Sequence, residues 1–206
     1  MKAVKYIIPV ILILVIAYNS VYFKKLDEVK ANKNASVFNP ALYAQGFWNA
    51  KLLPGINKAL AITELSTLLI DEPAKTFDKY SHALGIGNLR YFLVKGKGTI
   101  TSVNADDISV SLDSSSQHIT LATEYIFGNA VRDATGLISI TEFNNTMDFN
   151  NVSAEINKII REKVLPPIKK QAKKGDVISF TGAIELNKEH LDLSDIEVVP
   201  VEIKIL

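Results

Sequence analysis

The chain has 206 residues, enough for one domain and an appendage, and its 23 basic residues nearly balance its 22 acidic ones. A net charge of +1 supplies no general attraction to nucleic acid or to an acidic surface. The absence of cysteine excludes disulfide bonds, thiolate metal sites, thiol nucleophiles and a lipid attached through an N-terminal cysteine.

Residues 1–24 predict a membrane anchor. An uncharged, largely apolar run covers residues 6–23 and has lysines on both sides. As a helix it would reach about 27 Å, close to the roughly 30 Å of a bilayer core. The bulky stretch "AYNSVYF" lacks a signal-peptidase site, which favours an uncleaved anchor over a cleaved signal peptide. The run has no polar face, which disfavours an amphipathic or buried helix. The numbers of lysines before and after the run are nearly equal, so they do not decide the orientation in the membrane. An extracytoplasmic domain is expected because a short N-terminal tail followed by one long domain usually behaves as a signal anchor.

Residues 25–37 are polar and predict a spacer, and residues 38–88 predict a helical arm. Asn39 as N-cap and Pro40 at the first helical position favour a helix start. This helix is expected to end near Leu53, before a Pro-Gly pair. The spacing of Ala61, Leu65 and Leu68 predicts a second helix with one apolar face. This helix is expected to end at Pro73.

Residues 89–206 predict a mainly β domain, a five-stranded OB-like barrel. Three runs with apolar residues near period two, separated by "NADD" and "DSSS", predict a three-stranded meander. The next run predicts an amphipathic helix with Phe149, Val152, Ile156, Ile159, Ile160 and Val164 on its apolar face. Two more strands follow, and a helix between strands three and four is the order of an OB fold. Gly96 and Gly98 are expected at a bend or bulge, and Pro200 at a rim or bulge.

No pattern identifies a metal, cofactor or nucleic-acid site. His82, His118 and His190 lie far apart, without the spacing of a zinc site, and "GKG" lacks the spacing of a phosphate-binding loop. OB barrels that bind single strands need a basic groove with stacking aromatics, which this composition does not suggest. We therefore predict no metal, no cofactor and no nucleic-acid partner.

Four residues are candidates for a site: Arg132, Asp133, Asn145 and Trp48. Neighbours on a strand point to opposite faces, so Arg132 and Asp133 need not pair, and a structural role is favoured, with Arg132 on loop carbonyls and Asp133 capping a turn. The alternative is a guanidinium exposed in a pocket that binds a carboxylate, a phosphate or a sugar hydroxyl. Asn145 fits helix capping or loop hydrogen bonding. Trp48 fits a packing anchor between arm and barrel, or an exposed stacking platform.

Several segments resemble an uncharacterised family, a domain of unknown function found in predicted bacterial periplasmic lipoproteins. They are "FNPALYAQGFWNAKLLP", "VKGKGTI", "AVRDATGLISITEFNN" with "MDFNNVSAEIN", and "ISFTGAIEL". The resemblance runs from about Phe38 to Leu206. It implies an extracytoplasmic bacterial protein with an OB-like barrel, in a family often encoded beside sugar ABC-transport genes. It implies no activity. Because this chain has no lipid-bearing cysteine, its apolar helix must provide the anchor.

Together these features predict a non-enzymatic accessory or binding protein of unknown ligand. We expect a single-pass membrane protein whose domain is periplasmic or on the cell surface and serves a sugar ABC-type uptake system. Its partners would be the membrane, through the N-terminal helix, and a transporter or another envelope protein. One alternative is a hydrolase-like envelope enzyme that uses Arg132 and Asp133. Another is a structural envelope module that contacts peptidoglycan or a partner.

Overall fold

The computed structural model describes Val15 and residues 38–206, except Ile86 and Ser114. The predicted anchor and spacer, residues 1–37, therefore lie outside the described residues apart from Val15. Residues Asn39–Leu206 form one compact unit. Within the described part of the chain, no helix is both long and apolar enough to cross a membrane.

The predicted helical arm is a series of short helices and one very short strand. They are α3 (Pro40–Phe47), η1 (Trp48–Leu52), α4 (Leu53–Gly55), η2 (Ile56–Lys58), β1 (Leu60–Ala61), α5 (Ile62–Asp71) and α6 (Pro73–Tyr80). The start of α3 is as predicted, because the Asn39 side chain accepts a hydrogen bond from the Leu42 amide at 3.0 Å and Pro40 opens the helix. The predicted break at Pro73 is also confirmed, since α6 begins there.

The predicted end of the first helix near Leu53 is wrong. The helical path continues because η1 is a π turn, in which the Leu53 amide donates to the carbonyl of Trp48, five residues back. In a regular helix the ring of Pro54 would clash with the carbonyl four residues earlier, and the wider turn relieves this conflict. A second π turn, η4 (Ile160–Val164), ends two residues before Pro166, as η1 ends two residues before Pro54.

The predicted apolar face of the second helix is shifted. Ile62, Leu65 and Leu69 are buried, whereas Leu68 is only half-buried. Ala61 precedes the helix, because β1 takes it into the sheet as a parallel neighbour of β2. The helix therefore starts one residue later than the spacing suggested.

The remaining strands form one sheet with β1. They are β2 (Leu89–Val103), β3 (Asp107–Leu112), β4 (His118–Ala122), β5 (Val177–Asn187) and β6 (Ile196–Ile205). The predicted meander is confirmed, because β2, β3 and β4 pair antiparallel in sequence. The last two strands follow the helical segment as predicted, and β6 pairs parallel with β4 and antiparallel with β5. This is the strand order of an OB fold.

The five-stranded barrel of the prediction is realised as a six-stranded mixed sheet in the order β1-β2-β3-β4-β6-β5. The long strand β2 pairs with β5 over its first part and with β3 over its second part. The parallel β4–β6 ladder has only three residue pairs. A mixed sheet with OB-type order therefore describes the strands better than a closed barrel.

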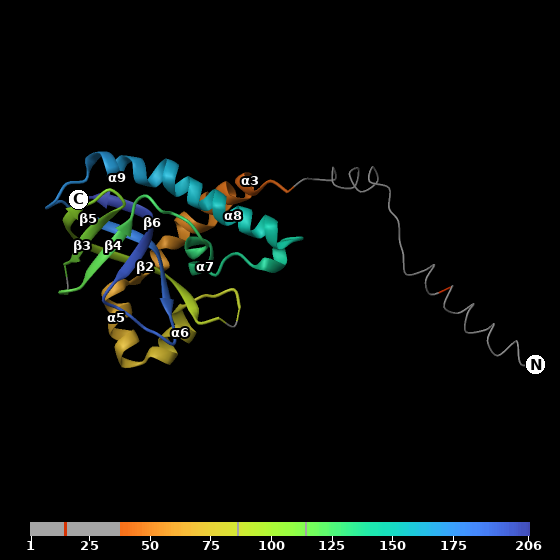
Figure 1. Cartoon of the computed structure of the whole chain (residues 1–206), viewed down its shortest axis with the longest axis horizontal. Coiled ribbons are helices and arrows are strands. Elements are labelled where there is room, and N and C mark those ends of the chain that lie inside the picture. The colour runs from red at the N-terminus through yellow and green to blue at the C-terminus, as the bar shows by residue number, and fades with distance from the viewer. Residues whose placement is uncertain (1–14, 16–37, 86, 114) are drawn as a thin grey trace, which may run out of the picture. The chain divides into compact units, whose positions relative to one another are not determined.

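The helical segment between β4 and β5 covers the sheet. It contains α7 (Ala130–Ala134), η3 (Ile140–Glu142), α8 (Thr146–Ile159), η4 and α9 (Leu165–Gln171). Figure 1 shows the run from α8 to α9 along one side of the sheet, with α5 and α6 on the other, and α3 packs beside α8. Of the predicted apolar face, the buried members are Phe149, Val152, Ile156 and Ile160, whereas Ile159 and Val164 are half-buried.

One close backbone approach and two register irregularities shape the pairing of the strands. A Cβ atom at Gly98 would lie 2.3 Å from the carbonyl oxygen of Ser111, so this glycine permits a close approach of β2 and β3. The bulge of β2 lies beyond both predicted glycines, between Ile100 and Ser102. Pro200 lies at a register irregularity between β5 and β6, as predicted.

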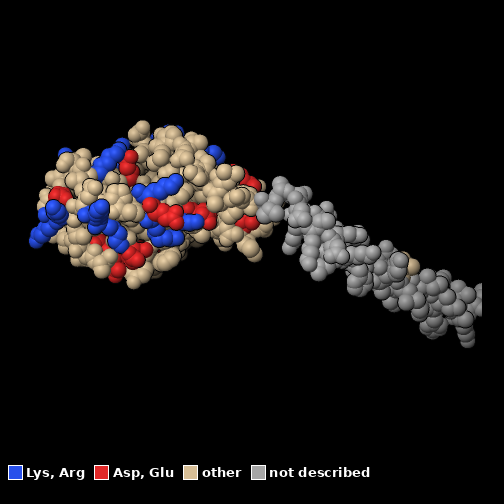
Figure 2. All heavy atoms as spheres, turned by 90° about the horizontal axis from the view of Figure 1, so that it is seen from above, with Lys and Arg blue, Asp and Glu red and all other residues tan. Residues whose placement is uncertain are grey.

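The surface carries both signs of charge. On the face shown in Figure 2, lysine and arginine side chains lie among aspartate and glutamate side chains. This face therefore presents no extended field of one sign.

We predict that Gly98→Ala lowers the free energy of unfolding by about 1–3 kcal/mol, because the added methyl group meets main chain that cannot move aside. Gly46→Ala is the matched control, since a Cβ atom there meets nothing within 4 Å and the position is helical. It should gain about 0.5–1 kcal/mol. Urea unfolding of both variants checks this, and equal effects would contradict the close approach.

Candidate functional site

The short helix α7 carries two charged side chains into the interior. Four of its five residues are buried, and it contacts β2, β5, β6 and α8. Arg132 is 3% exposed and Asp133 is 5% exposed. The strand geometry expected for these two residues does not apply, because they lie on a helix.

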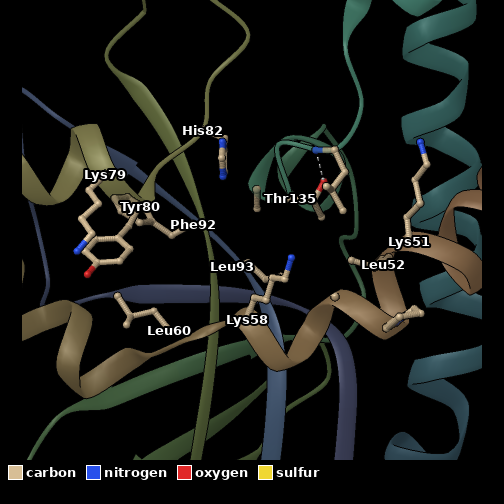
Figure 3. A pocket seen from close by; sticks show the side chains of 14 residues that line it. Lys51, Leu52, Lys58, Leu60, Lys79, Tyr80, His82, Phe92, Leu93 and Thr135 are labelled. Carbon is tan, nitrogen blue, oxygen red and sulfur yellow. Dashed lines mark hydrogen bonds between the residues drawn. The ribbon is translucent and has the colours of Figure 1, made fainter.

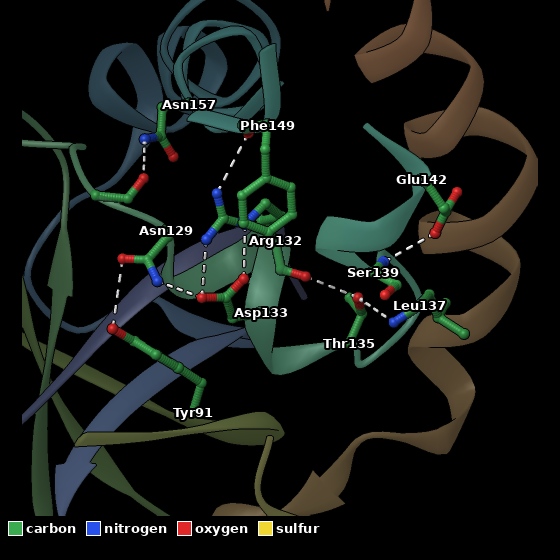
Figure 4. Close-up of polar contacts among 11 residues, drawn as sticks. Tyr91, Asn129, Arg132, Asp133, Thr135, Leu137, Ser139, Glu142, Phe149 and Asn157 are labelled. Atoms are coloured by element: carbon green, nitrogen blue, oxygen red, sulfur yellow. Dashed lines mark hydrogen bonds and ion pairs between the residues drawn. The ribbon is translucent and has the colours of Figure 1, made fainter. Parts of the chain in front are cut away.

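Arg132 and Asp133 form a two-point ion pair. The Arg132 Nε lies 2.6 Å from Asp133 Oδ1, and Nη2 donates to Oδ2 at 3.0 Å (Figure 4). The Arg132 Nη1 donates to the carbonyl of Phe149 at 3.3 Å, and the guanidinium carbon lies 3.6 Å from the centre of the Phe149 ring. The buried cation thus has a carboxylate, a carbonyl and a ring face, which together offset the loss of water.

A chain of hydrogen bonds ties this pair to the sheet. The Asn129 amide donates to Asp133 Oδ2, and the Tyr91 hydroxyl approaches Asn129 Oδ1 at 3.4 Å. Burial, together with the neighbouring Glu185, raises the pKa of Tyr91 to about 12, so its phenol stays a donor at neutral pH. The network therefore runs from β2 through α7 to α8 (Figure 4).

The turn after α7 is held by a different residue from the one predicted. The Thr135 hydroxyl donates to the carbonyl of Arg132 at 3.0 Å and accepts from the Leu137 amide at 3.2 Å. Asp133 contributes only its carbonyl, which accepts from the Gly136 amide. Its carboxylate is occupied by Arg132 and Asn129, so Thr135 supplies the side-chain cap.

The other two candidate residues lie apart from the ion pair. Asn145 is the exposed N-cap of α8, where its side chain accepts from the Asp148 amide at 2.8 Å. Trp48 lies in η1 and is 6% exposed, which does not fit an exposed stacking platform. Among the described residues, neither hydrogen-bonds to Arg132 or Asp133.

A cavity of about 620 Å³ adjoins Arg132. The wall formed by α8 and η4 carries polar side chains at intervals of four residues, and we call them the polar column: Ser153, Asn157 and Arg161. The Asn157 amide donates to the carbonyl of Gly128 at 2.8 Å, and Arg161 donates to that of Ile126. These bonds fix the loop that forms the opposite wall. We call this space the α8 cavity.

The polar column was not predicted from the sequence, although its spacing is a usable signal. Residues four apart share one side of a helix, and Asn157 stands beside the apolar Ile156. The ring of Phe127 on the loop is 69% exposed, with the Arg161 guanidinium 5.9 Å from its centre. An aromatic face and several hydrogen-bonding groups therefore meet in one cavity.

Asp133 borders a different, smaller cavity of about 280 Å³, together with His82 and Ser139. These are the residue types of a hydrolytic triad. However, within the described part of the chain no hydrogen bond joins His82 to either partner. Asp133 is held by Arg132 and Asn129, and the Ser139 hydroxyl contacts that of Thr141 at 2.7 Å. Arg132 and Asp133 thus pair with each other but do not line one common cavity.

Comparison with known proteins places the chain in a family. The family model of a predicted periplasmic lipoprotein (DUF2291) matches residues 11–204. The chain belongs to this family. It is also similar to the crystal structure of an OB-fold protein from Thermotoga maritima MSB8, with a TM-score of 0.74, 28% identity, and coverage of 83% of this chain and 100% of that chain. No curated protein matches the chain.

These findings agree with the family and the fold expected from the sequence. Family membership supports an extracytoplasmic, membrane-associated location. The structural neighbour supports the OB-type order of the strands. The family has no established function, so the site must be interpreted from its own residues.

We predict that Asp133→Asn lowers the free energy of unfolding by about 3–5 kcal/mol, because it leaves the buried Arg132 without a counter-charge. Glu72→Gln is the matched control, since it breaks the 2.7 Å ion pair with Lys75 at the surface. The side chain of Glu72 is 53% exposed and that of Lys75 is 73% exposed. That change should cost less than about 1 kcal/mol. Chemical denaturation measures both, and a cost for Asp133→Asn as small as that of the control would contradict a stabilising role.

A second prediction concerns Ser153, whose buried hydroxyl has no hydrogen-bond partner among the described residues. Ser153→Ala should leave the free energy of unfolding unchanged or raise it by up to about 1 kcal/mol, because it removes an unpaired polar atom. Thr76→Val removes a buried hydroxyl that contacts the carbonyls of Leu68 and Glu72, both at 2.9 Å. It should cost about 1 kcal/mol in the same unfolding assay. An equal loss in Ser153→Ala would indicate a partner for its hydroxyl.

Proposed function

We propose that the protein is a membrane-anchored, extracytoplasmic binding module that serves an ABC-type sugar-uptake system. Residues 1–24 would cross the membrane once, and the OB-type domain would hold a sugar in the α8 cavity. The absence of a cysteine in the chain supports an apolar anchor in place of a lipid. A helix in the bilayer is a stronger tether than one acyl chain.

The observation that carries the proposal is the lining of the α8 cavity. Asn129, Asn150 and Asn157 contribute amides, and Arg161 contributes a guanidinium. Amides can donate to and accept from the hydroxyl groups of a sugar, and the guanidinium adds several donors in a plane. Among the described residues that line this cavity there is no carboxylate and no histidine. Such a lining favours binding over acid–base catalysis.

The loop from Ile126 to Asn129 supports a site that is already formed before binding. Asn157 on α8 and Arg161 on η4 hold its carbonyls. The ring of Phe127 has the Tyr125 ring at 6.4 Å and the Arg161 guanidinium at 5.9 Å as neighbours. It is still 69% exposed, so its exposed part can stack on the C–H surface of a pyranose or pentose. A fixed wall lowers the entropy that a ligand must lose on binding.

Isothermal titration of the full chain in phosphatidylcholine nanodiscs with a panel of monosaccharides tests the proposal. We expect binding of at least one sugar, and an affinity about tenfold lower in Phe127→Ala, because the ring face is lost. Ile70→Ala is the matched control, since Ile70 on α5 is 72% exposed and does not line the cavity. It should bind as the unaltered chain does.

Copurification tests the second half of the proposal. The intact chain, isolated from its own membranes, is expected to bring transporter subunits with it. Failure to bind any sugar, together with failure to retain a transporter that is present in the membrane, would refute the proposed role.

A further inference from the structure

A separate cavity of about 650 Å³ borders α7 at its last residue, Ala134. The helical arm lines it from Lys51 to Leu60, and the end of α6 lines it at Lys79 and Tyr80. Its remaining walls come from β2 and from the residues that follow Asp133. None of the residues around the α8 cavity takes part. We call it the arm cavity.

The charge around the arm cavity is of one sign. Lys51, Lys58 and Lys79 line it, and no aspartate or glutamate is among the described residues that do so. Figure 3 shows Lys79 on one side, Lys51 on the other and Lys58 between them. Within the described part of the chain none of the three forms an ion pair, and Lys79 instead lies 4.7 Å from the centre of the Tyr80 ring. Three lysines therefore line the cavity. The Glu142 carboxylate, whose pKa is lowered mainly by the Ser139 amide and to a lesser degree by Tyr43 and Lys51, is not among the lining residues.

The floor of the arm cavity is apolar. Leu52 and Phe92 are buried there, and Leu60 and Leu93 are half-buried at its edge. A wall of this kind gains free energy when an apolar group displaces water from it. A cavity of several hundred Å³, largely apolar with a few placed polar groups, is the usual form of a small-molecule site.

His82 adds a fixed ring to the same cavity. A Cβ atom at Gly136 would lie 2.5 Å from this ring, so the glycine allows the imidazole to pack on the main chain. Burial, and then the neighbouring Arg90, lowers the pKa of His82. The positive charge of the cavity at neutral pH thus resides on its lysines, and the imidazole offers an uncharged polar edge.

We propose that the arm cavity is a second binding site, which takes a small amphiphilic anion: the lysines that line the cavity, Lys51, Lys58 and Lys79, attract its carboxylate or phosphate, and its apolar body lies on Leu52 and Phe92. Charge-assisted hydrogen bonds from ammonium groups select the head group, and the apolar floor selects against anions that have no hydrocarbon part. The head group belongs to a free acid or to an acidic lipid of the adjoining membrane.

The test uses the full chain in phosphatidylcholine nanodiscs, titrated with 4-phenylbutyrate. The site predicts binding of this acid, with at least tenfold weaker binding of the neutral 4-phenylbutanamide and of acetate, since each lacks one half of the recognised chemistry. The double variant Lys51→Gln/Lys58→Gln should lose about tenfold in affinity for the acid. Lys170→Gln/Lys174→Gln removes the same charge from exposed positions that do not line the cavity, and should bind normally.

Nanodiscs that contain phosphatidylglycerol separate the two sources of the head group. If phosphatidylglycerol weakens the binding of 4-phenylbutyrate, and this competition is lost in Lys51→Gln/Lys58→Gln, the site is assigned to an acidic lipid. If phosphatidylglycerol leaves the affinity for 4-phenylbutyrate unchanged, the site is assigned to a free acid. No binding of the acid, equal binding of acid and amide, or equal losses in the two double variants would overturn the proposal. Phe127→Ala should not alter any of these titrations, because Phe127 lines only the α8 cavity.

Discussion

The structure depends on the stabilisation of one buried charge, the guanidinium of Arg132. Arg132 contacts the carboxylate of Asp133 and both the carbonyl and the ring of Phe149. The Asn129 amide donates a further hydrogen bond to the Asp133 carboxylate. Each partner comes from a different part of the helical segment or from the loop before it. A buried charge is tolerated only when all its partners are in place, so this cluster specifies one arrangement of α7 on the sheet and of α8 on α7.

The same helix divides the spaces around it. Arg132 lines the α8 cavity, Asp133 borders the small cavity beside His82, and Ala134 lines the arm cavity. The α8 cavity and the arm cavity therefore both border this one short helix, with amides and two arginines lining the first and three lysines lining the second. Their shapes depend on a helix too short to be stable by itself, which tertiary contacts hold in place.

Much of the fold could be predicted because its signals are local. Alternating apolar residues identified the meander, and Asn39 with Pro40 identified a helix start. The features that were missed depend on contacts distant in the sequence. Helix α7 is too short to show a helical period, and β1 has only two residues, so neither could be distinguished from a loop. The site was predicted in part: Arg132 and Asp133 were both singled out, but no local pattern indicated the short helix α7 on which they pair.

The long strand β2 has a consequence for how the molecule is made. Its ladder with β5 joins Leu89 to Asn187. The sheet therefore cannot be completed until Asn187 has been synthesised, about a hundred residues after the strand with which it pairs. For a protein of an extracytoplasmic family this order is useful. A polypeptide whose sheet is completed late stays unfolded for longer, and an unfolded chain is the form that passes most readily through a narrow channel.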